Sequence, residues 1–298
     1  MKSLFYFPTE FKDRIFEVHK ENGLKWLDQL PGLMSEFERR WDFRFISPVK
    51  NLSYGFVAEV EYQNRTAILK MNPDAGIITK ETHWLNGFSK VTPKIFADAS
   101  AEGVFLMEKI EPGFTLKTLV QNNEDEKATR IVCDMVKALQ STPYKSDEFP
   151  HLSEMKHISL LHGHYDKDLV EKAESLYTDL THKSSSDVVL HGDLHHDNIL
   201  SCGNSWKVID PHGYIGDPVF EISPFMYNPL DVLPSAENLE SILRRRTEIL
   251  AEEMSFDPYR MRAGAFCMMM LSMAWTYEGT GKVPLFEARA ARILSALV

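Results

Sequence analysis

The chain has 298 residues, 44% of them hydrophobic, and a formal net charge of -10 at pH 7. This length and composition allow a sizeable core, and they predict one large domain or two lobes. The negative charge argues against non-specific nucleic-acid binding, which needs a basic surface. It is compatible with a cationic small-molecule partner, and it leaves the oligomeric state open.

The sequence also bears on where the protein works. It contains no run of about 18 uncharged apolar residues, so we expect no membrane span. The first residues hold too short an apolar stretch for a signal peptide before charged residues follow. Cys133, Cys202 and Cys267 are widely spaced and odd in number, which indicates reduced thiols rather than a disulfide framework. We therefore expect a cytoplasmic protein.

The first part of the chain predicts a helical segment followed by strands. Apolar residues recur at helical spacing through residues 8–40, and we expect Pro31 to interrupt that helix. Alternation typical of strands begins near Phe43, and residues 48–62 predict two strands around a turn that contains Gly55. In isolation this stretch favours a plain hairpin turn, because glycine is common in turns.

A buried ion pair is expected in the next two elements. Residues 66–71 form a third strand in which Lys70 is surrounded by apolar residues. Such a lysine can simply extend to the surface. The following helix, however, carries an apolar stripe from Ile77 to Phe88, and Glu81 lies on that stripe. An inward-facing carboxylate is costly unless a cation meets it, so we expect Lys70 to pair with Glu81.

We place a domain boundary near the end of the next strand. Residues 104–113 predict a strand broken by Pro112 and Gly113, which divides the chain into residues 1–110 and 111–298. The remainder is mostly helical. Helices are expected over residues 124–141, 166–182, 236–254, 257–279 and 284–298, with the methionine-rich run 268–273 filling the core.

Residues 188–221 carry the chemistry. Two short apolar runs, 198–201 and 206–209, flank a Cys-Gly-Asn turn and predict a hairpin. Asp193 precedes the first run, Asn198 begins it, and Asp210 follows the second. The hairpin would bring these three side chains to one end of a small sheet. A carboxylate for a hydroxyl proton, with an asparagine and a second carboxylate for Mg²⁺, is what phosphoryl transfer requires.

These motifs resemble a known family. His-Gly-Asp-Leu-His-x-x-Asn from His191, followed by Ile-Asp-Pro and by Gly-Asp-Pro-x-x-Glu ending at Glu221, is similar to the aminoglycoside phosphotransferase and choline kinase family. The run Ile-Asp-Pro-His-Gly-Tyr-Ile-Gly-Asp-Pro is most similar to its streptomycin 6-kinase and hydroxyurea kinase branch. Two residues depart from the family pattern: Asp197 stands where glycine is usual, and Glu221 where aspartate is common.

The resemblance implies an α+β, two-lobed protein-kinase-like fold. Residues 1–110 would form an N-terminal lobe, with a helical extension and an antiparallel sheet that covers the nucleotide. Residues 111–298 would form a mostly helical lobe with the catalytic loop. The implied activity is transfer of the γ-phosphoryl group of ATP, with Mg²⁺, to a hydroxyl of a small molecule. A peptide acceptor is not expected, because no long peptide-docking segment follows Asp210.

Each motif residue receives an expected role. Asp193 is the catalytic base, and Asn198 and Asp210 are the Mg²⁺ ligands. We expect His191, Asp217 and Glu221 to be structural. For the nucleotide, the resemblance implies contacts by Gly55 in a phosphate-covering loop, by Lys70 and Glu81 at the phosphates, and by a hinge from Glu108 to Ile110 at the adenine edge.

Two alternatives remain open. The histidines at positions 162, 164, 191, 195 and 196 have spacings found in metal sites, and with Asp193 and Asp210 they could bind Zn²⁺ or two metals, which is the pattern of a metal-dependent hydrolase. A nucleotide-binding regulator without catalysis is the other. The acceptor itself is not readable from the sequence, although Asp231 and Glu278 are acidic candidates for its site.

Overall fold

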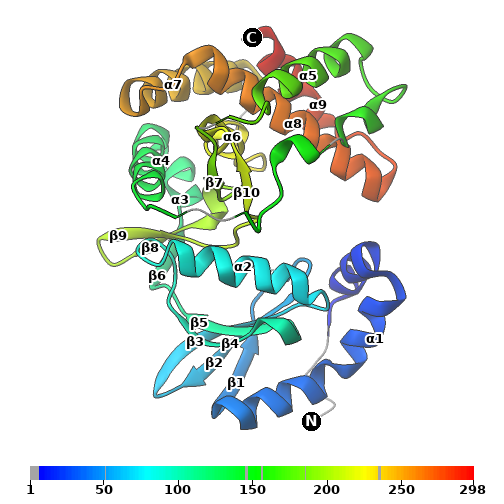
Figure 1. Ribbon diagram of the computed structural model, residues 1–298, viewed down its shortest axis with the longest axis vertical. Coiled ribbons are helices and arrows are strands. Elements are labelled where there is room, and N and C mark those ends of the chain that lie inside the picture. Colours follow the sequence, from blue (N-terminus) through cyan, green and yellow to red (C-terminus); the bar gives the residue numbers. More distant parts are fainter. Residues whose placement is uncertain (1–6, 51, 145–146, 156, 185, 234–235) are drawn as a thin grey trace. The chain divides into compact units, whose positions relative to one another are not determined.

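The structure is a computed structural model that describes residues 7–50, 52–144, 147–155, 157–184, 186–233 and 236–298. Residues 1–6, on which the expectation about a signal peptide partly depends, lie outside the described residues. The chain divides into two compact units, Met1–Ile110 and Glu111–Val298. Figure 1 labels their helices and strands.

The first unit is built on a five-stranded antiparallel sheet in the order β1-β2-β3-β5-β4. Helix α1 (Thr9–Trp41) covers one face of this sheet and α2 (Ala75–Gly87) lies over the other (Figure 1). Alternate residues of the central strands point into the core beneath α1, as the period of a strand requires. The strands are β1 (Phe43–Pro48), β2 (Phe56–Tyr62), β3 (Arg65–Met71), β4 (Ile95–Ala99) and β5 (Val104–Glu108).

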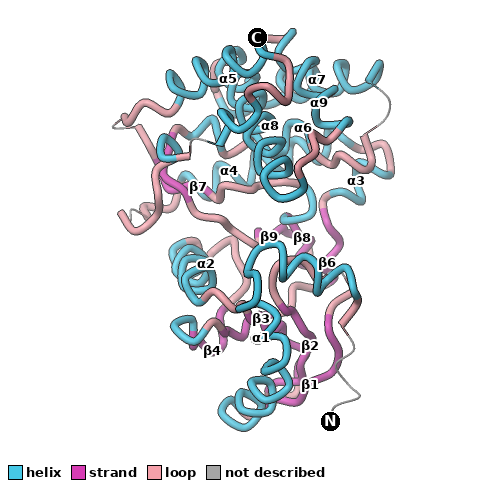
Figure 2. Tube along the Cα trace, turned by 90° about the vertical axis from the view of Figure 1, so that its right-hand side faces the viewer, coloured by secondary structure: helices cyan, strands magenta, loops and turns pink. Residues whose placement is uncertain are grey.

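The expected break of the first helix at Pro31 is wrong. Helix α1 continues through Pro31, and its backbone leaves helical geometry at Lys20 instead, with φ 53° and ψ -143°. The two limbs on either side of the kink pack closely against each other. A Cβ added to Gly23 on one limb would lie only 2.6 Å from Cγ2 of Ile15 on the other. Figure 2 shows the two limbs beside the sheet. Packing of the buried side chains near Pro31, such as Leu30, outweighs the local cost of proline.

The face of α2 also differs in one position from the expectation. Ile77 is 41% exposed, whereas its neighbour Ile78 is only 2% exposed. The buried stripe therefore runs through Ile78, Glu81 and Leu85. Glu81 is buried as predicted, with 5% of its surface exposed. The Asp74 side chain begins the helix by accepting a hydrogen bond from the Gly76 N–H at 2.9 Å.

The second unit contains two small sheets. Strands β6, β8 and β9 form one sheet, and β7 pairs with β10 in the other. The predicted hairpin is confirmed, because β8 and β9 pair from Ile199 opposite Val208 to Cys202 opposite Ser205. The strands are β6 (Pro112–Thr115), β7 (Val188–Leu190), β8 (Ile199–Cys202), β9 (Ser205–Val208) and β10 (Tyr214–Gly216).

Helices make up the rest of this unit, and α8 lies at their centre. Helix α8 packs against α5, α6 and α9, and Met268 to Met273 lie in the core as predicted. The expected helical segments are all present within a few residues of the expected ends. They are α4 (Asp125–Gln140), α5 (Lys167–Leu180), α7 (Ala236–Met254), α8 (Pro258–Thr280) and α9 (Leu285–Ala296), joined by the short α3 (Lys117–Gln121) and α6 (Ser223–Tyr227).

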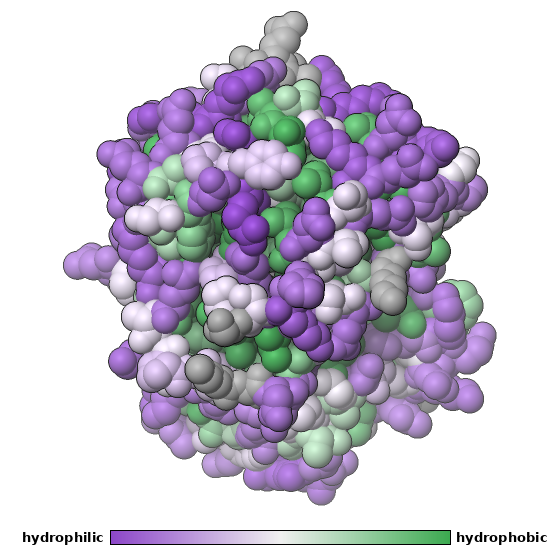
Figure 3. Space-filling view, turned by 45° about the horizontal axis from the view of Figure 1, so that its top comes forward, coloured by the Kyte–Doolittle hydropathy of each residue, from purple (hydrophilic) through white to green (hydrophobic). Residues whose placement is uncertain are grey.

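The described helices are not of the membrane-spanning kind. Among the residues that the structure describes, no helix is both long and apolar enough to cross a bilayer. On the face shown in Figure 3, hydrophilic side chains predominate, and apolar ones lie mainly in recesses among them.

Candidate active site

The loop between β7 and β8 holds the predicted catalytic residue. It ends in a short 3₁₀ helix, His196–Asn198, and it is closed by backbone hydrogen bonds from His195 N to Asp193 O at 2.9 Å and from Asn198 N to His195 O at 3.0 Å. Gly192 has φ +84°, and a Cβ there would lie 2.5 Å from the Tyr214 ring. The loop conformation therefore requires glycine at this position.

His191 fixes the start of the loop. Its Nε2 lies 2.8 Å from the Ile209 carbonyl oxygen, and its Nδ1 accepts the backbone N–H of Asp193 at 3.3 Å. The ring is therefore neutral with its proton on Nε2. Burial lowers the pKa of His191 to about 4, so the ring does not charge near neutral pH. These contacts agree with the expectation that His191 orders the loop.

The side chain of Asp193 lies among nitrogen donors. Its Oδ2 is 3.4 Å from Nδ2 of Asn198, 3.5 Å from Nε2 of His195 and 3.9 Å from Nε2 of His212. Burial alone would raise the pKa of Asp193, but hydrogen bonding and charge from His195, followed by charge from His212, bring this pKa below its ordinary value. The carboxylate is ionised at neutral pH and is one-third exposed, with 33% of its side chain accessible.

Asn198 and Asp210 are brought to one end of the hairpin. The Ile209 N–H donates to the Asn198 carbonyl oxygen at 3.0 Å, just beyond the paired strands, and Asp210 is the next residue after Ile209. Asp210 has a left-handed backbone, φ 59°, and is exposed. The Asn198 amide nitrogen donates to Asp193 O at 2.9 Å, so its Oδ1 is the oxygen that it offers to a cation. Two oxygen donors of this kind fit Mg²⁺.

Glu221 supports the same loop from the next segment. Both of its carboxylate oxygens lie 3.1 Å from the backbone nitrogen of His191, which donates to them. Burial raises the pKa of Glu221 to about 8, although hydrogen bonds from the backbone of His191 and Gly192 oppose this rise. Nearby, Asp217 accepts the Val219 N–H at 2.9 Å and caps a short 3₁₀ helix. Both acidic residues have the structural contacts that we expected.

Lys117 is a residue that the sequence did not reveal. Its Nζ lies 3.7 Å from the carboxylate of Asp197 and 2.6 Å from that of Asp231. The extra negative charge of Asp197, next to Asn198, is therefore compensated within the same unit. Asp231, which we considered as an acceptor contact, is already paired with a lysine. No local pattern indicates this cluster, because Lys117 is far from both aspartates along the chain.

The first unit contains the predicted ion pair. Lys70 Nζ lies 2.6 Å from Glu81 Oε1, and the two side chains are only 14% and 7% exposed. Strand pairing sets Lys70 beside Phe105, whose ring centroid is 6.0 Å from Nζ. Alternation along β3 puts Lys70 on the face opposite to the buried Leu69. That face is the one that α2 covers, which is why the pair forms.

Gly55, Glu108 and Ile110 have structural explanations beside the predicted nucleotide contacts. A Cβ at Gly55 would lie 3.0 Å from the carbonyl oxygen of Met71, so close packing already favours glycine there. The Glu108 N–H donates to the Lys94 carbonyl oxygen at 2.8 Å and is not the group that would meet an adenine. Ile110 is buried, with 7% of its surface exposed. Their contact with a nucleotide stays a prediction.

Histidines that the hydrolase alternative would use as metal ligands contact different partners in the structure. His162 lies 2.9 Å from the Glu174 carboxylate, and His196 stacks on Phe225 with ring centroids 4.4 Å apart. Within the part of the chain that the structure describes, no group of three or more histidine, cysteine, aspartate or glutamate side chains is arranged to hold a metal ion. The structure thus gives the hydrolase alternative no metal centre built from those residue types.

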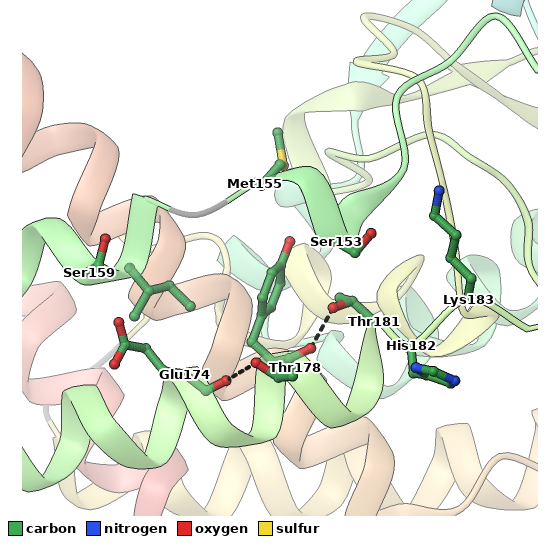
Figure 4. Close-up of a pocket in the computed structure, with 10 residues that line it drawn as sticks. Ser153, Met155, Ser159, Glu174, Thr178, Thr181, His182 and Lys183 are labelled. Carbon is green, nitrogen blue, oxygen red and sulfur yellow. Dashed lines mark hydrogen bonds between the residues drawn. The ribbon is translucent and has the colours of Figure 1, made fainter.

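A pocket of about 710 Å³ opens elsewhere in the second unit. Helix α5 and the segments before and after it line this pocket. Figure 4 shows Glu174 and Lys183 toward its opposite ends, with Ser153 and Thr181 between them. None of the predicted catalytic or metal-binding residues contributes to its lining. The pocket is therefore distinct from the loop that contains Asp193.

Comparison with known proteins gives a consistent result. The model of a family described as aminoglycoside/hydroxyurea antibiotic resistance kinase matches residues 53–279. Streptomycin 3''-kinase from Klebsiella pneumoniae is 29% identical over 188 residues, which cover 59% of this chain and 68% of that protein. Streptomycin 6-kinase from Streptomyces glaucescens is 23% identical over 277 residues, covering 87% of this chain and 86% of that protein.

A solved structure shows the fold. The crystal structure of a thermostable mutant of an aminoglycoside phosphotransferase, in ternary complex with ADP and hygromycin B, superposes with a TM-score of 0.63 at 12% identity. The match covers 88% of this chain and 97% of that one. The expected α+β, protein-kinase-like fold, with an antiparallel-sheet lobe and a mostly helical lobe, is confirmed.

Proposed function

Because the chain belongs to the aminoglycoside/hydroxyurea antibiotic resistance kinase family, we propose that Asp193, Asn198 and Asp210 are the residues that carry out its phosphoryl transfer. The protein is a small-molecule kinase, which moves the γ-phosphoryl group of ATP to a hydroxyl group of a small molecule. The observation that supports our assignment is the hairpin, which brings Asn198 and Asp210 together beside the ionised Asp193.

Asp193 is proposed to accept the proton of the attacking hydroxyl. Its carboxylate is ionised because neighbouring histidines lower its pKa, and it remains accessible enough to meet a substrate. The Asn198 amide, which donates to its Oδ2 at 3.4 Å, orients it. A base that is ionised, oriented and reachable is what proton transfer requires. His191 takes no part in that transfer, because one ring nitrogen is bonded to the Ile209 carbonyl oxygen and the other to the backbone N–H of Asp193.

Asn198 and Asp210 are proposed to hold Mg²⁺ through side-chain oxygens. The bound ion would neutralise charge on the phosphate oxygens, which is its usual part in phosphoryl transfer. The chain's contribution is to fix the two donors, which the β8–β9 pairing does. The Asn198 amide nitrogen is directed to Asp193, so the same residue orients the base.

The nucleotide phosphates are proposed to bind Lys70. Glu81 holds the ammonium group and restricts its position, as in the lysine–glutamate pair of kinases. We also propose that the backbone near Gly55 binds the nucleotide phosphates and that the segment from Glu108 to Ile110 binds the adenine. Three free thiols and the use of ATP support a cytoplasmic location.

The acceptor is proposed to be a hydroxylated or N-hydroxylated small molecule, which is cationic if it is an aminocyclitol such as streptomycin and uncharged if it is hydroxyurea. Streptomycin and hydroxyurea are the first candidates, because the names of the family and its members point to them. A cation matches the formal net charge of -10, and it would be attracted to the protein by long-range electrostatics.

Transfer of labelled phosphate from ATP tests the function directly. The purified protein is incubated with a panel of aminocyclitols, hydroxyurea and amino alcohols, and in parallel with a peptide library. We expect phosphorylation of a small molecule, and efficient labelling of peptides alone would contradict the proposal. Stoichiometric zinc in the purified protein, with no turnover of ATP, would favour the hydrolase instead.

Substitution of Asp193 tests its assigned role. Asp193→Ala should lower kcat by about 10²–10⁴, the scale of losing a general base, and nucleotide binding should persist. Asp179→Ala, at an exposed position on α5, is the matched control and should retain wild-type turnover. Full turnover by Asp193→Ala on an accepted substrate would exclude Asp193 as the base.

A further inference from the structure

A fully buried arginine lies behind the catalytic loop. Arg246, on α7, has 0% of its surface exposed. Its guanidinium forms an ion pair with Asp125 of α4, with Nη2 to Oδ1 at 2.6 Å, and its centre lies 4.6 Å from the centroid of the Phe225 ring. A charge in such a position is tolerated only when it is paired and its donors are satisfied. Each N–H of Arg246 therefore has to be accounted for.

One nitrogen of the guanidinium forms hydrogen bonds with the C-terminal end of α6. Arg246 Nη1 donates to the carbonyl oxygens of Phe225 at 2.8 Å, Met226 at 2.9 Å and Asn228 at 2.6 Å. These carbonyls lie at the C-terminal end of a helix, where a cation is favoured. The arginine thus ties α4, α6 and α7 into one rigid group. Nε and one N–H of Nη2 donate to Asp125, so the second N–H of Nη2 remains for a contact beyond this group.

That contact reaches the catalytic loop. Arg246 Nη2 lies 3.3 Å from Nε2 of His196, and the His196 ring is fully buried and stacked on Phe225. An arginine can only donate, so Nε2 accepts and the ring proton is on Nδ1. This Nδ1 is buried and has no hydrogen-bond partner among the described residues. The ring orientation is therefore set by Arg246 and by stacking.

His196 is the first residue of the 3₁₀ helix that ends at Asn198. A rotation or shift of its ring would move the backbone that carries the Asn198 side chain. That side chain donates to Asp193 O at 2.9 Å, so any displacement would reach the base as well. A continuous chain of contacts thus runs from the helical group, through His196, to the reacting end of the loop.

We propose that Arg246 is a positioning residue for phosphoryl transfer. It acts through His196 to hold the side chains of Asn198 and Asp193 in their relative positions. The inference rests on the proposed function of those two residues. It adds a polar link that none of the motif residues contains. The competing interpretation is that Arg246 only joins helices, with His196 a passive neighbour.

Substitution of His196 separates the two interpretations, because it leaves the bonds of Arg246 to Asp125 and α6 in place. His196→Leu removes the acceptor at similar volume, and His196→Gln keeps an acceptor oxygen that can meet Arg246. His151→Leu is the matched control, since His151 is also a buried histidine of this unit, 6% exposed, and is paired with Asp187 at 3.0 Å outside the loop.

The first measurement is hydrogen exchange of the peptide that spans residues 191–200. His196→Leu should accelerate exchange in this peptide by roughly three- to tenfold, the scale of one lost hydrogen bond. His196→Gln should return exchange toward the wild-type rate, and His151→Leu should leave it unchanged. Exchange in His196→Leu equal to that of the wild type, or matched by His151→Leu, would overturn the proposal. This measurement requires no turnover, so it stands apart from the test of the proposed function.

The second measurement is steady-state kinetics with an accepted substrate. His196→Leu should lower kcat and raise the Mg²⁺ concentration needed for half-maximal rate, with partial rescue in His196→Gln. A loss of activity that only follows the fall in unfolding temperature, as in His151→Leu, would show that the link is merely structural.

Discussion

At the scale of single residues, two buried groups hold the loop that contains Asp193. His191 is kept neutral and links the loop to the end of β9, and Glu221 accepts the backbone N–H of His191. Neither group is placed to touch a substrate. Substitution of either residue should disturb the loop, because removing a buried group from a hydrogen-bond network leaves its partners unsatisfied.

The stability of the protein should depend on the protonation of Glu221. Burial raises its folded-state pKa from 4.5 to about 8, so the folded state binds a proton that the unfolded state releases. Its contribution to stability is therefore complete below the unfolded pKa, and it is lost as pH rises toward the folded pKa. Glu221→Gln removes this dependence. Urea unfolding at pH 5 and pH 8 should show a larger loss of stability in the wild type than in Glu221→Gln, and equal losses would contradict the assignment.

At the scale of elements, helix α1 shows how packing can override a local signal. Its kink lies at Lys20 rather than at Pro31, and its buried residues join the core of the sheet. The helix therefore depends on the close approach of its limbs at Gly23. The β8–β9 hairpin behaves in the opposite way, since a short-range pattern fully specified it.

Two glycines of α1 should respond in opposite directions to alanine. Gly23→Ala would place a Cβ 2.6 Å from Ile15 Cγ2, and the overpacking should destabilise the fold by about 1–3 kcal/mol. Gly32→Ala meets nothing within 4 Å, and it should stabilise the fold by up to about 1 kcal/mol, because alanine is the better helix former. Chemical unfolding of both variants tests this, and equal effects would mean that the limbs do not pack as described.

The contact between α3 and the catalytic loop should affect nucleotide binding. Lys117→Ala leaves the charge of Asp197 uncompensated beside Asn198, which should raise the KM for Mg-ATP about two- to fivefold, the range for a partly exposed pair. Asp197→Gly in the same chain should restore the wild-type KM.

The exposed pair of Lys127 and Glu124 provides the control for this charge effect. Lys127→Ala removes the same charge from α4 and should leave KM unchanged. An increase in KM by Lys117→Ala that Asp197→Gly fails to reverse would point to a different role for the lysine. Comparison of the wild type, Lys117→Ala and the double variant with Asp197→Gly therefore isolates the interaction between Lys117 and Asp197.

At the scale of the whole molecule, binding of Mg-nucleotide should stabilise the fold. A ligand that binds only the native state adds about 2.7 kcal/mol at 100 times its Kd. Mg-ATP should therefore raise the unfolding temperature of the wild type and of Asp193→Ala. The increase should be much smaller for Asp210→Asn, in which a proposed ligand of the ion loses its negative charge. Thermal unfolding with ATP, with and without Mg²⁺, measures this, and an equal increase for Asp210→Asn would remove Asp210 from the metal site.

The sequence by itself determined the elements and contacts that depend on short spacings. The alternation of β2 and β3, the hairpin that carries Asn198 to Asp210, and the pairing of Lys70 with Glu81 follow from residues that are near in sequence. Periodicity decides which side such a residue faces, so its neighbours are constrained before the chain folds.

Only the tertiary structure decided the contacts between distant segments. Arg246 meets His196 from 50 residues away and Asp125 from 121 residues away, and Lys117 reaches both Asp197 and Asp231. The kink at Lys20 and the burial of Ile78 in place of Ile77 were likewise settled by packing. The physical reason is that a buried charge finds its partner through the arrangement of whole helices, which no local spacing encodes.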